Sequence, residues 1–173
     1  MPNIKEVKNR IGSVKSTQQL TKAMKMVAAA KLKRAQEKVT ELRPYSSKLN
    51  EILSNLSDTI SNVLFEQRDD KKRLFVVIAS DKGLCGSFNS NIFKLFNSII
   101  EDKKYDTNAI HIIPIGKKAY DYFKKKNYEV IDQFWNTLNG FSYADASNIF
   151  DYVRNEYLDN NIDQVHIIYN EFK

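Results

Sequence analysis

The residues best suited to chemistry lie in one short stretch, SDKGLCGSFN, at positions 80 to 89. The stretch follows an apolar, β-branched run and precedes a helical pattern, a place where α/β proteins often bind phosphate. A dinucleotide fingerprint needs G-x-G-x-x-G, whereas Gly83 and Gly86 are spaced G-x-x-G without a third glycine. We therefore expect the two glycines to supply positive φ angles in a tight turn, with Ser87 or Asn89 capping the helix.

A second phosphate-binding motif fails in the same way. A P-loop requires G-x-x-x-x-G-K-[ST], and the stretch ending in Gly116-Lys117-Lys118 has His111 where the first glycine should be. Lys118 also stands where the motif needs a hydroxyl. The sequence therefore predicts neither a nucleotide site nor a bound cofactor.

Cys85, the single cysteine, is a candidate nucleophile in the loop. Its activation would need a neighbouring base or an electropositive environment. His111 and His166 both stand between apolar residues of predicted strands, which favours packing roles, and Asp81 beside Lys82 favours a solvated charge pair. We therefore expect no catalytic group and no metal cluster. A lone cysteine also excludes an internal disulfide and favours a reducing compartment.

The loop belongs to a region, residues 67–173, in which short apolar runs alternate with helical patterns. Alternation of this kind predicts crossover connections and a mainly parallel sheet with helices on its faces. The predicted fold class is therefore α/β, with a Rossmann-like βαβ domain that we expect to be cut short at its C-terminal end. The strands are expected at 74–80, 109–115, 128–134 and 164–170, and the helices near 87–102, 117–126 and 142–158.

Residues 3 to about 64 carry a heptad pattern, and a first domain is predicted over residues 1–66. The pattern keeps its phase from Ile4 through nine heptads, which favours one half of a left-handed coiled coil. Pro44 falls at the outer position f, so a kink is expected there more than a break. The seam residues at positions a and d include Ile4, Val7, Ile11, Val14, Leu32, Ala35, Val39 and Leu42.

The net charge of +6 is concentrated at the N-terminal end. Residues 1–43 hold 11 Lys/Arg against 3 Asp/Glu, whereas residues 44–173 hold 16 against 18. Seven of those 11 basic residues lie at heptad positions e or g and so flank the seam. A seam needs a partner, so we expect a second helix that either belongs to another chain or is missing from this one.

The stretch TKAMKMVAAAK, residues 21–31, is apolar on almost every side of the helix. Small alanines and adaptable methionines allow close contact without deep interlocking, which predicts that other protein surrounds this segment. A groove-reading helix would carry polar side chains here, and a membrane-surface helix would show a bulky aromatic face. No apolar run is long enough to span a membrane and the N-terminus has no apolar signal core, so a cytoplasmic location is expected.

Two stretches closely resemble one known family. Residues 4–36, IKEVKNRIGSVKSTQQLTKAMKMVAAAKLKRAQ, and residues 80–92, SDKGLCGSFNSNI, resemble the γ subunit of F-type ATP synthases in order and separation. The similarity extends over the whole chain. The residues of the family's loop motif are Asp81, Lys82, Gly83, Leu84, Cys85 and Gly86.

The resemblance implies a non-catalytic central rotor that couples proton flow to ATP synthesis. The implied partners are the alpha and beta subunits, the epsilon subunit and the membrane c-ring, at the cytoplasmic face of a bacterial inner membrane. The family's long C-terminal helix would be the missing seam partner, which implies that the chain is a fragment or a truncated form. The residues implied to contact the alpha/beta ring are Lys22, Ala23, Met24, Met26 and Val27.

Two other hypotheses remain at this point. The alternative is a basic coiled-coil protein that binds nucleic acid and carries an α/β appendage, because clustered Lys/Arg along a helix is typical of phosphate binding. The third is an α/β enzyme that uses the loop at 80–89. The resemblance implies no nucleic-acid partner and attachment to the membrane only through other subunits.

Overall fold

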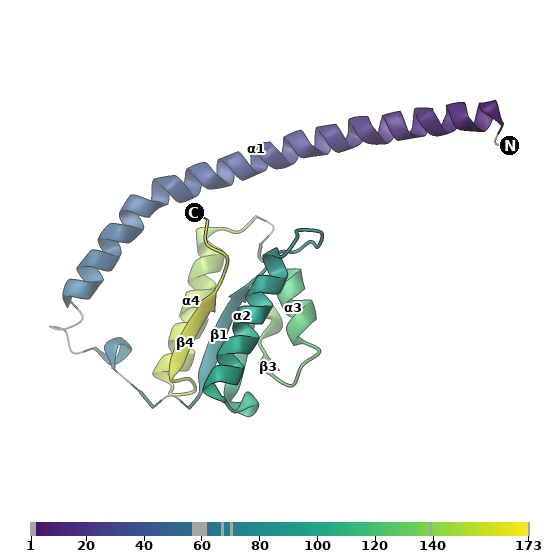
Figure 1. The fold of residues 1–173 in the computed structure, drawn as a ribbon. Helices are drawn as coiled ribbons and strands as arrows, with labels where there is room; N and C mark the ends of the chain where they lie inside the picture. The colour runs from purple at the N-terminus through teal and green to yellow at the C-terminus, as the bar shows by residue number, and fades with distance from the viewer. Residues whose placement is uncertain (1–2, 57–61, 67, 70, 139, 173) are drawn as a thin grey trace. The chain divides into compact units, whose positions relative to one another are not determined.

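A computed structural model describes residues 3–56, 62–66, 68–69, 71–138 and 140–172. The chain divides into two compact units, Met1–Ile60 and Ser61–Lys173, and each is described by itself. The first contains one long helix, and the second contains a small sheet with helices (Figure 1).

Helix α1 spans Ile4–Leu56 and has no buried residue. Asn3 starts it, because its carbonyl accepts the Glu6 N–H (2.8 Å) and its side chain accepts the Lys5 N–H (3.2 Å). The helix continues through Pro44, where a kink was expected more than a break. Figure 1 shows the helix curved along its length, most strongly toward its C-terminal end.

The helical pattern expected to reach residue 64 does not continue that far as an α-helix. Residues 57–61 lie outside the described part of the chain, and Val63–Phe65 form a separate 3₁₀ turn, η1. Asn62 is extended, with φ −138°, and its side chain accepts the Leu64 N–H at 2.9 Å. This local side-chain bond starts a new turn and competes with continuation of the helix.

The second unit is built on a four-stranded parallel sheet in the order β3-β2-β1-β4, which confirms the predicted α/β class. Central β1 is buried on both faces, as expected for a parallel sheet covered by crossover helices. In the register, Phe75 of β1 lies between Ile112 of β2 and His166 of β4. The strands are β1 (Arg73–Ile78), β2 (Ile110–Ile115), β3 (Glu129–Val130) and β4 (Gln164–Ile168).

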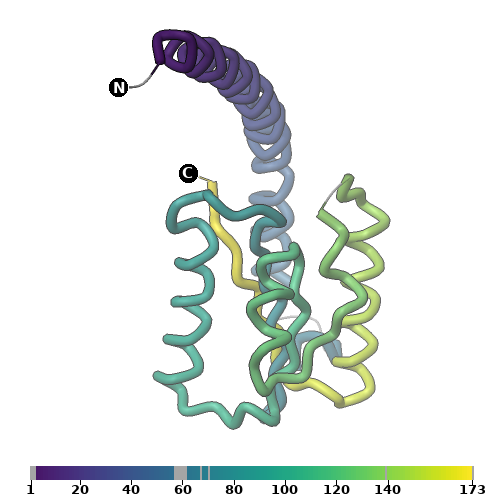
Figure 2. The backbone as a smooth tube through the Cα atoms, turned by 90° about the vertical axis from the view of Figure 1, so that its right-hand side faces the viewer, coloured from purple at the N-terminus to yellow at the C-terminus, as the bar shows by residue number. Residues whose placement is uncertain are grey.

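Two apolar cores lie on opposite faces of the sheet, and Figure 2 shows the helices on its two sides. On one face, α2 (Phe88–Lys103) and α3 (Lys117–Phe123) cover alternate residues of β1, and Phe96 packs edge to face on both Phe75 and Phe123. On the other face, Ile149 of α4 (Tyr143–Leu158) packs in the core that contains Leu74 and Val76. Successive side chains of β1 point to opposite faces of the sheet and therefore pack in the two cores in turn.

The strand expected at 128–134 is only partly present. Its first part pairs with β2 as the two-residue strand β3, and Asp132–Phe134 then form a 3₁₀ turn, η3. The Ile131 N–H still donates to the Ile112 carbonyl at 2.8 Å. Ile131 and Phe134 both pack against the core under α4, and their spacing of three residues suits a turn of helix better than a strand.

Helix α4 begins with a reciprocal capping box. The Asp145 N–H donates to Ser142 Oγ (3.4 Å), while the Ser142 N–H and hydroxyl both donate to Asp145 Oδ2 (2.8 and 2.6 Å). The hydrogen bond from the Ser142 hydroxyl, and next the one from the Ser142 backbone N–H, lower the pKa of the Asp145 carboxyl below its ordinary value. The two residues therefore fix where α4 starts.

We predict that this cap makes stability depend on pH in the acid range. Because the folded-state pKa of Asp145 is lowered, its contribution is complete above the unfolded-state pKa and is lost as pH falls through the folded value. Asp145→Asn should be less stable than the parent at neutral pH and should lose less stability on acidification below pH about 4. Urea unfolding followed by Trp135 fluorescence measures this, with Asp151→Asn on the same helix as control. Parallel pH profiles for the parent and Asp145→Asn would contradict it.

Candidate functional site

The loop after β1 is organised by Asn89, in the first turn of α2. Its Oδ1 accepts the Ser80 N–H at 3.0 Å, and its Nδ2 donates to Ser80 Oγ (2.8 Å) and to Cys85 Sγ (3.2 Å). Ser87 occupies the N-cap position of α2, but its side chain makes no capping bond. Ser87 therefore has the expected position without a side-chain capping bond, and the expectation is wrong for Asn89, whose amide instead joins the two ends of the loop.

The turn in this loop uses positive φ at two positions, and only one is a predicted glycine. Gly86 has φ +60°, as expected, and Leu84 has φ +58°, whereas Gly83 is not among the residues with positive φ. Leu84 is also fully exposed. A leucine in this region is strained, whereas a glycine is not. The expectation for Gly83 is therefore wrong.

Asp81 is a structural residue of the loop. Its Oδ1 accepts the Lys117 N–H at 3.0 Å, and the neighbouring Ser80 carbonyl accepts the Lys118 N–H at 3.0 Å. These bonds connect the loop after β1 to the start of α3, so Asp81 has a structural role in addition to its charge. Gly116, which directly follows β2, has φ +94° and donates its N–H to the Trp135 carbonyl at 2.9 Å.

The chain changes direction across the sheet between β1 and β4, the point where open α/β sheets usually bind ligands. At this point, Asn170 follows β4 and its Nδ2 donates to the Phe88 carbonyl at 2.9 Å. Asn89 lies on the same side of the sheet and bonds the end of β1. The amide groups of both asparagines are thus engaged with the chain itself, and the loop is better suited to holding its own shape than to cradling phosphate.

The two histidines lie away from Cys85. In the register, His111 pairs with Leu74 and His166 with Phe75, near the start of β1, whereas the loop containing Cys85 follows the end of that strand. His166 stacks on Phe75 with ring centroids 4.9 Å apart, and His111 Nδ1 lies 3.3 Å from Glu129 Oε2. Within the described ranges, no three His, Cys, Asp or Glu side chains could share a metal ion.

A prediction follows for the amide network of the loop. Asn89→Ala removes the hydrogen bonds to Ser80 and Cys85 and leaves the Ser80 N–H to find another partner, so we expect a loss of about 1–3 kcal/mol in unfolding free energy. Asn91→Ala is the matched control, because that amide bonds Ser87 Oγ at 3.3 Å on the exposed surface of the same helix turn. Urea titration should show a much smaller change for the control. Equal losses would mean that the Asn89 network is not what holds the loop.

The second candidate surface is the apolar stripe of α1. The seam residues with large apolar side chains have exposed fractions between 39% (Val39) and 85% (Ile4). Near the start of the helix, Val7, Ile11 and Val14 line a shallow depression that Arg10 and Lys15 border. The stripe therefore combines an apolar centre with basic edges on a helix that buries nothing of its own.

The segment at 21–31 exposes apolar side chains in several directions. Met24, Met26 and Val27 are 64%, 59% and 57% exposed and stand at heptad positions g, b and c. At 100° per residue these positions point to different sides of the helix, so one partner helix could not cover all three. Lys22 and Ala23 of the same segment are also exposed.

The comparisons with known proteins decide which family this arrangement belongs to. A family model described as ATP synthase matches residues 3–173. Over the whole of this chain, the ATP synthase gamma chain of Cytophaga hutchinsonii is 47% identical and that of Chloroherpeton thalassium is 43% identical. The chain belongs to the ATP synthase gamma-chain family. The match spans 61% and 59% of those two gamma chains, so the chain covers about three-fifths of their length.

For this member of the gamma-chain family, none of the described helices combines the length and the apolar character that a membrane span requires. The family assignment confirms the resemblance expected from residues 4–36 and 80–92.

Sequence reasoning missed one feature of this gamma-family chain, the segment that leads into β1. We call residues 62–66, 68–69 and 71–72 the strap. The Arg68 guanidinium lies over the Tyr157 ring, 3.7 Å from its centroid, and donates to the carbonyls of Tyr157 and Ile162. The Tyr157 hydroxyl donates to the Glu66 carbonyl at 3.1 Å. The strap is thus bound to the C-terminal end of α4.

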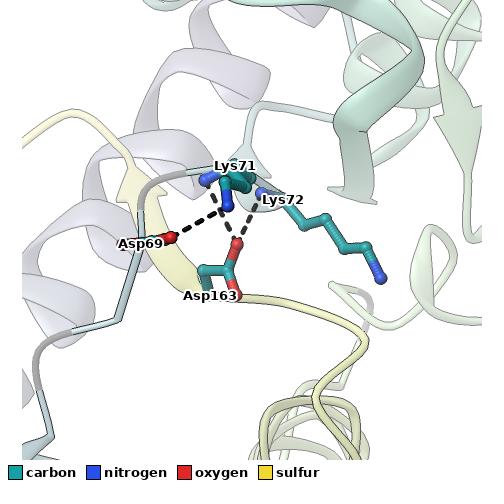
Figure 3. A network of polar contacts seen from close by, with 4 residues as sticks. All are labelled: Asp69, Lys71, Lys72 and Asp163. Carbon is teal, nitrogen blue, oxygen red and sulfur yellow. Dashed lines mark hydrogen bonds and ion pairs between the residues drawn. The ribbon is translucent and has the colours of Figure 1, made fainter.

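Asp163 holds the other end of the strap, as Figure 3 shows. Its Oδ2 accepts the backbone N–H groups of Lys71 (3.1 Å) and Lys72 (2.8 Å), and its own N–H donates to the Lys72 carbonyl (2.8 Å). Lys71 Nζ also pairs with Asp69 at 2.8 Å. The only signal in the sequence was that Asp163, an acidic residue, stands directly before a strand. That signal does not show which residues the carboxylate binds or how far away along the chain they lie.

Proposed function

We propose that this chain forms part of the central rotor of an F-type ATP synthase and contains no active site of its own. The observation that carries the proposal is α1, a 53-residue helix without a buried residue in a chain of the gamma-chain family. A long helix with apolar side chains exposed along it gains its stability by packing on other chains or segments.

The proposed role is transmission of rotation between the membrane c-ring and a ring of alpha and beta subunits, which couples proton flow to ATP synthesis. The segment at 21–31 would run inside the alpha/beta ring, with its apolar residues touching different walls as it turns. The residues proposed to make this contact are Lys22, Ala23, Met24, Met26 and Val27.

The seam of α1 would pack against the long C-terminal helix of a complete gamma chain. The α/β unit would lie nearer to the epsilon subunit and the c-ring, at the cytoplasmic face of a bacterial inner membrane, and partner subunits would attach it to that membrane. The family loop at 81–86 would serve as a rigid surface feature of this unit, since Asn89 and Asp81 fix its shape.

The test is a chimera. Residues 1–173 replace the aligned portion of the Cytophaga hutchinsonii gamma chain, and the product is assembled with that organism's alpha and beta subunits and membrane sector. We expect the chimera to copurify with alpha and beta and to support ATP-driven proton pumping. Failure to assemble where the unaltered gamma chain does so would overturn the proposal.

We also predict that the purified 173-residue chain does not hydrolyse ATP, because both histidines lie near the start of β1, away from Cys85, and the Asp81 carboxylate is bonded to the Lys117 N–H. The sequence also matches neither phosphate-binding motif. A coupled assay for ADP release measures this in the presence of Mg²⁺. Hydrolysis that copurifies with the chain and disappears in Lys82→Ala or Cys85→Ser would show a catalytic site in the loop and would favour the enzyme hypothesis.

A further inference from the structure

The signs of the charges beside the seam of α1 are all alike. The positions that flank a coiled-coil seam, e and g, choose its partner through charge pairs. None of the four acidic residues of α1 occupies these positions, because Glu6 and Glu41 stand at c and Glu37 and Glu51 at f. The flanking basic residues are Lys8, Arg10, Lys15, Lys22, Lys31, Lys38 and Arg43.

The side chains of α1 keep this separation in three dimensions. Lys33 pairs with Glu37 at 3.8 Å and Lys48 with Glu51 at 2.7 Å, and both pairs join residues on the outer side of the helix, at b, c and f. On the seam side, Arg10 and Lys15 border the depression lined by apolar residues. Over residues 4–14 and 32–42 the seam therefore presents an apolar centre with positive edges, whereas Gln18, Thr21 and Lys25 occupy a and d positions between these two stretches.

A second copy of this chain fits this surface poorly. In a parallel pair, position g of one helix faces e of the other, and in an antiparallel pair e faces e and g faces g. Either arrangement sets basic residues against basic or neutral ones, and like charges in such pairs are destabilising. The charge pattern thus selects against self-association while it leaves the apolar seam available to another helix.

We propose that the seam of α1 takes a helix with apolar a and d positions and Asp or Glu at e and g. This inference rests on the proposed function, since it specifies the chemistry of the seam partner in the assembled rotor. Opposite charges along several heptads then set both the choice of partner and the register. Duplex DNA would also meet the basic edges, but it would leave the apolar centre between them in contact with water or phosphate.

The experiment uses the full 173-residue chain and synthetic helical probes. One labelled probe of about six heptads has Leu and Ile at a and d with Glu at e and g, and a second probe differs only by Lys at e and g. Binding is measured by fluorescence anisotropy at 50 mM and at 500 mM salt. We expect the Glu probe to bind at least about tenfold more tightly than the Lys probe at low salt, and the preference to shrink at high salt.

Charge-reversed chains supply the decisive comparison. Lys8→Glu, Lys15→Glu and Lys31→Glu together reverse three flanking charges, whereas Lys5→Glu, Lys33→Glu and Arg34→Glu together reverse three charges at b and c. The first triple variant should lose most of the preference for the Glu probe, and the second should keep it at the same net charge. If both triple variants lose the preference for the Glu probe equally, net charge alone explains the binding, and the proposal is overturned.

Three other outcomes would also overturn it: equal binding of the two probes, a parent chain that dimerises through α1 at micromolar concentration, and tighter binding of duplex DNA than of the Glu probe. The chimera reports separately on the proposed function. If the chimera assembles and pumps while the two probes bind alike, the charge rule fails and the rotor assignment stands.

Discussion

Replacing Gly116 by alanine is expected to destabilise the α/β unit by at least about 3 kcal/mol. The residue has φ +94°, a conformation that side chains rarely adopt, and an added Cβ would lie 2.1 Å from the Ala79 carbonyl oxygen and 2.8 Å from Leu138 Cδ1. The carbonyl belongs to the end of the sheet, where the Ala79 N–H bonds the Ile115 carbonyl at 2.9 Å. Relief of the clash would therefore pull strand ends apart.

The chain offers two graded controls for this prediction. Gly86 has φ +60° but open space around its Cβ position, so Gly86→Ala should cost only about 1 kcal/mol of left-handed strain. Gly83 has Lys118 Cε at 3.7 Å, an ordinary contact, so Gly83→Ala should change stability by less than about 0.5 kcal/mol.

Trp135 is the single tryptophan, and its carbonyl accepts the Gly116 N–H, so its fluorescence reports urea unfolding at this place. If Gly116→Ala loses no more unfolding free energy than Gly86→Ala, the strand ends can relax around the added Cβ. That result would contradict the predicted clash with the Ala79 carbonyl.

Replacing Met24 by lysine is expected to weaken the coupling between ATP hydrolysis and proton pumping in an assembled enzyme. The substitution puts a charged side chain on the segment that we propose to be enclosed, where it must find an acidic partner or stay poorly solvated. Either an ion pair with the ring or a poorly solvated charge would change the energy of some rotational positions of the shaft more than that of others. A difference of about 1.4 kcal/mol between two positions changes their populations tenfold.

The measurement compares ATP hydrolysis with ATP-driven pumping in the chimera. Hydrolysis should fall less than pumping, because the catalytic residues are proposed to lie in other chains. Glu37→Lys is the control at an outer position, where the side chain now makes an exposed pair with Lys33 at 3.8 Å, and its effect should be milder. Undiminished pumping per ATP in Met24→Lys would contradict the enclosure of residues 21–31.

The sheet and its covering helices could be predicted because the local pattern and the tertiary environment agree. The run at 74–80 is apolar at successive positions, and β1 is buried on both faces. Periods near 3.6 likewise marked α2 and α4 to within a few residues. Two predictions were wrong where a side chain could form alternative local hydrogen bonds. The Asn62 side chain starts a separate turn where the helix was expected to continue, and the Asn89 side chain bonds Ser80 where a cap of α2 was expected.

The candidate surfaces could be predicted to different degrees. The apolar stripe of α1 follows directly from heptad spacing, because a helix fixes the direction of each side chain. The amide network of the loop and the strap depend on contacts between distant positions. Arg68 and Ile162, for example, are 94 positions apart in the chain, yet the Arg68 guanidinium donates to the Ile162 carbonyl. Periodicity carries no information about such pairs.

The strap also determines how the α/β unit would bear a mechanical load. A pull or twist that arrives through the strap does not act on β1 alone, because Arg68 transmits it to the end of α4 and Asp163 transmits it to the start of β4. β1 and β4 run parallel and share a register from Arg73 and Gln164 onward, so force along the strands shears several hydrogen bonds at once. Peeling, which breaks such bonds one after another, would first require the strap to detach.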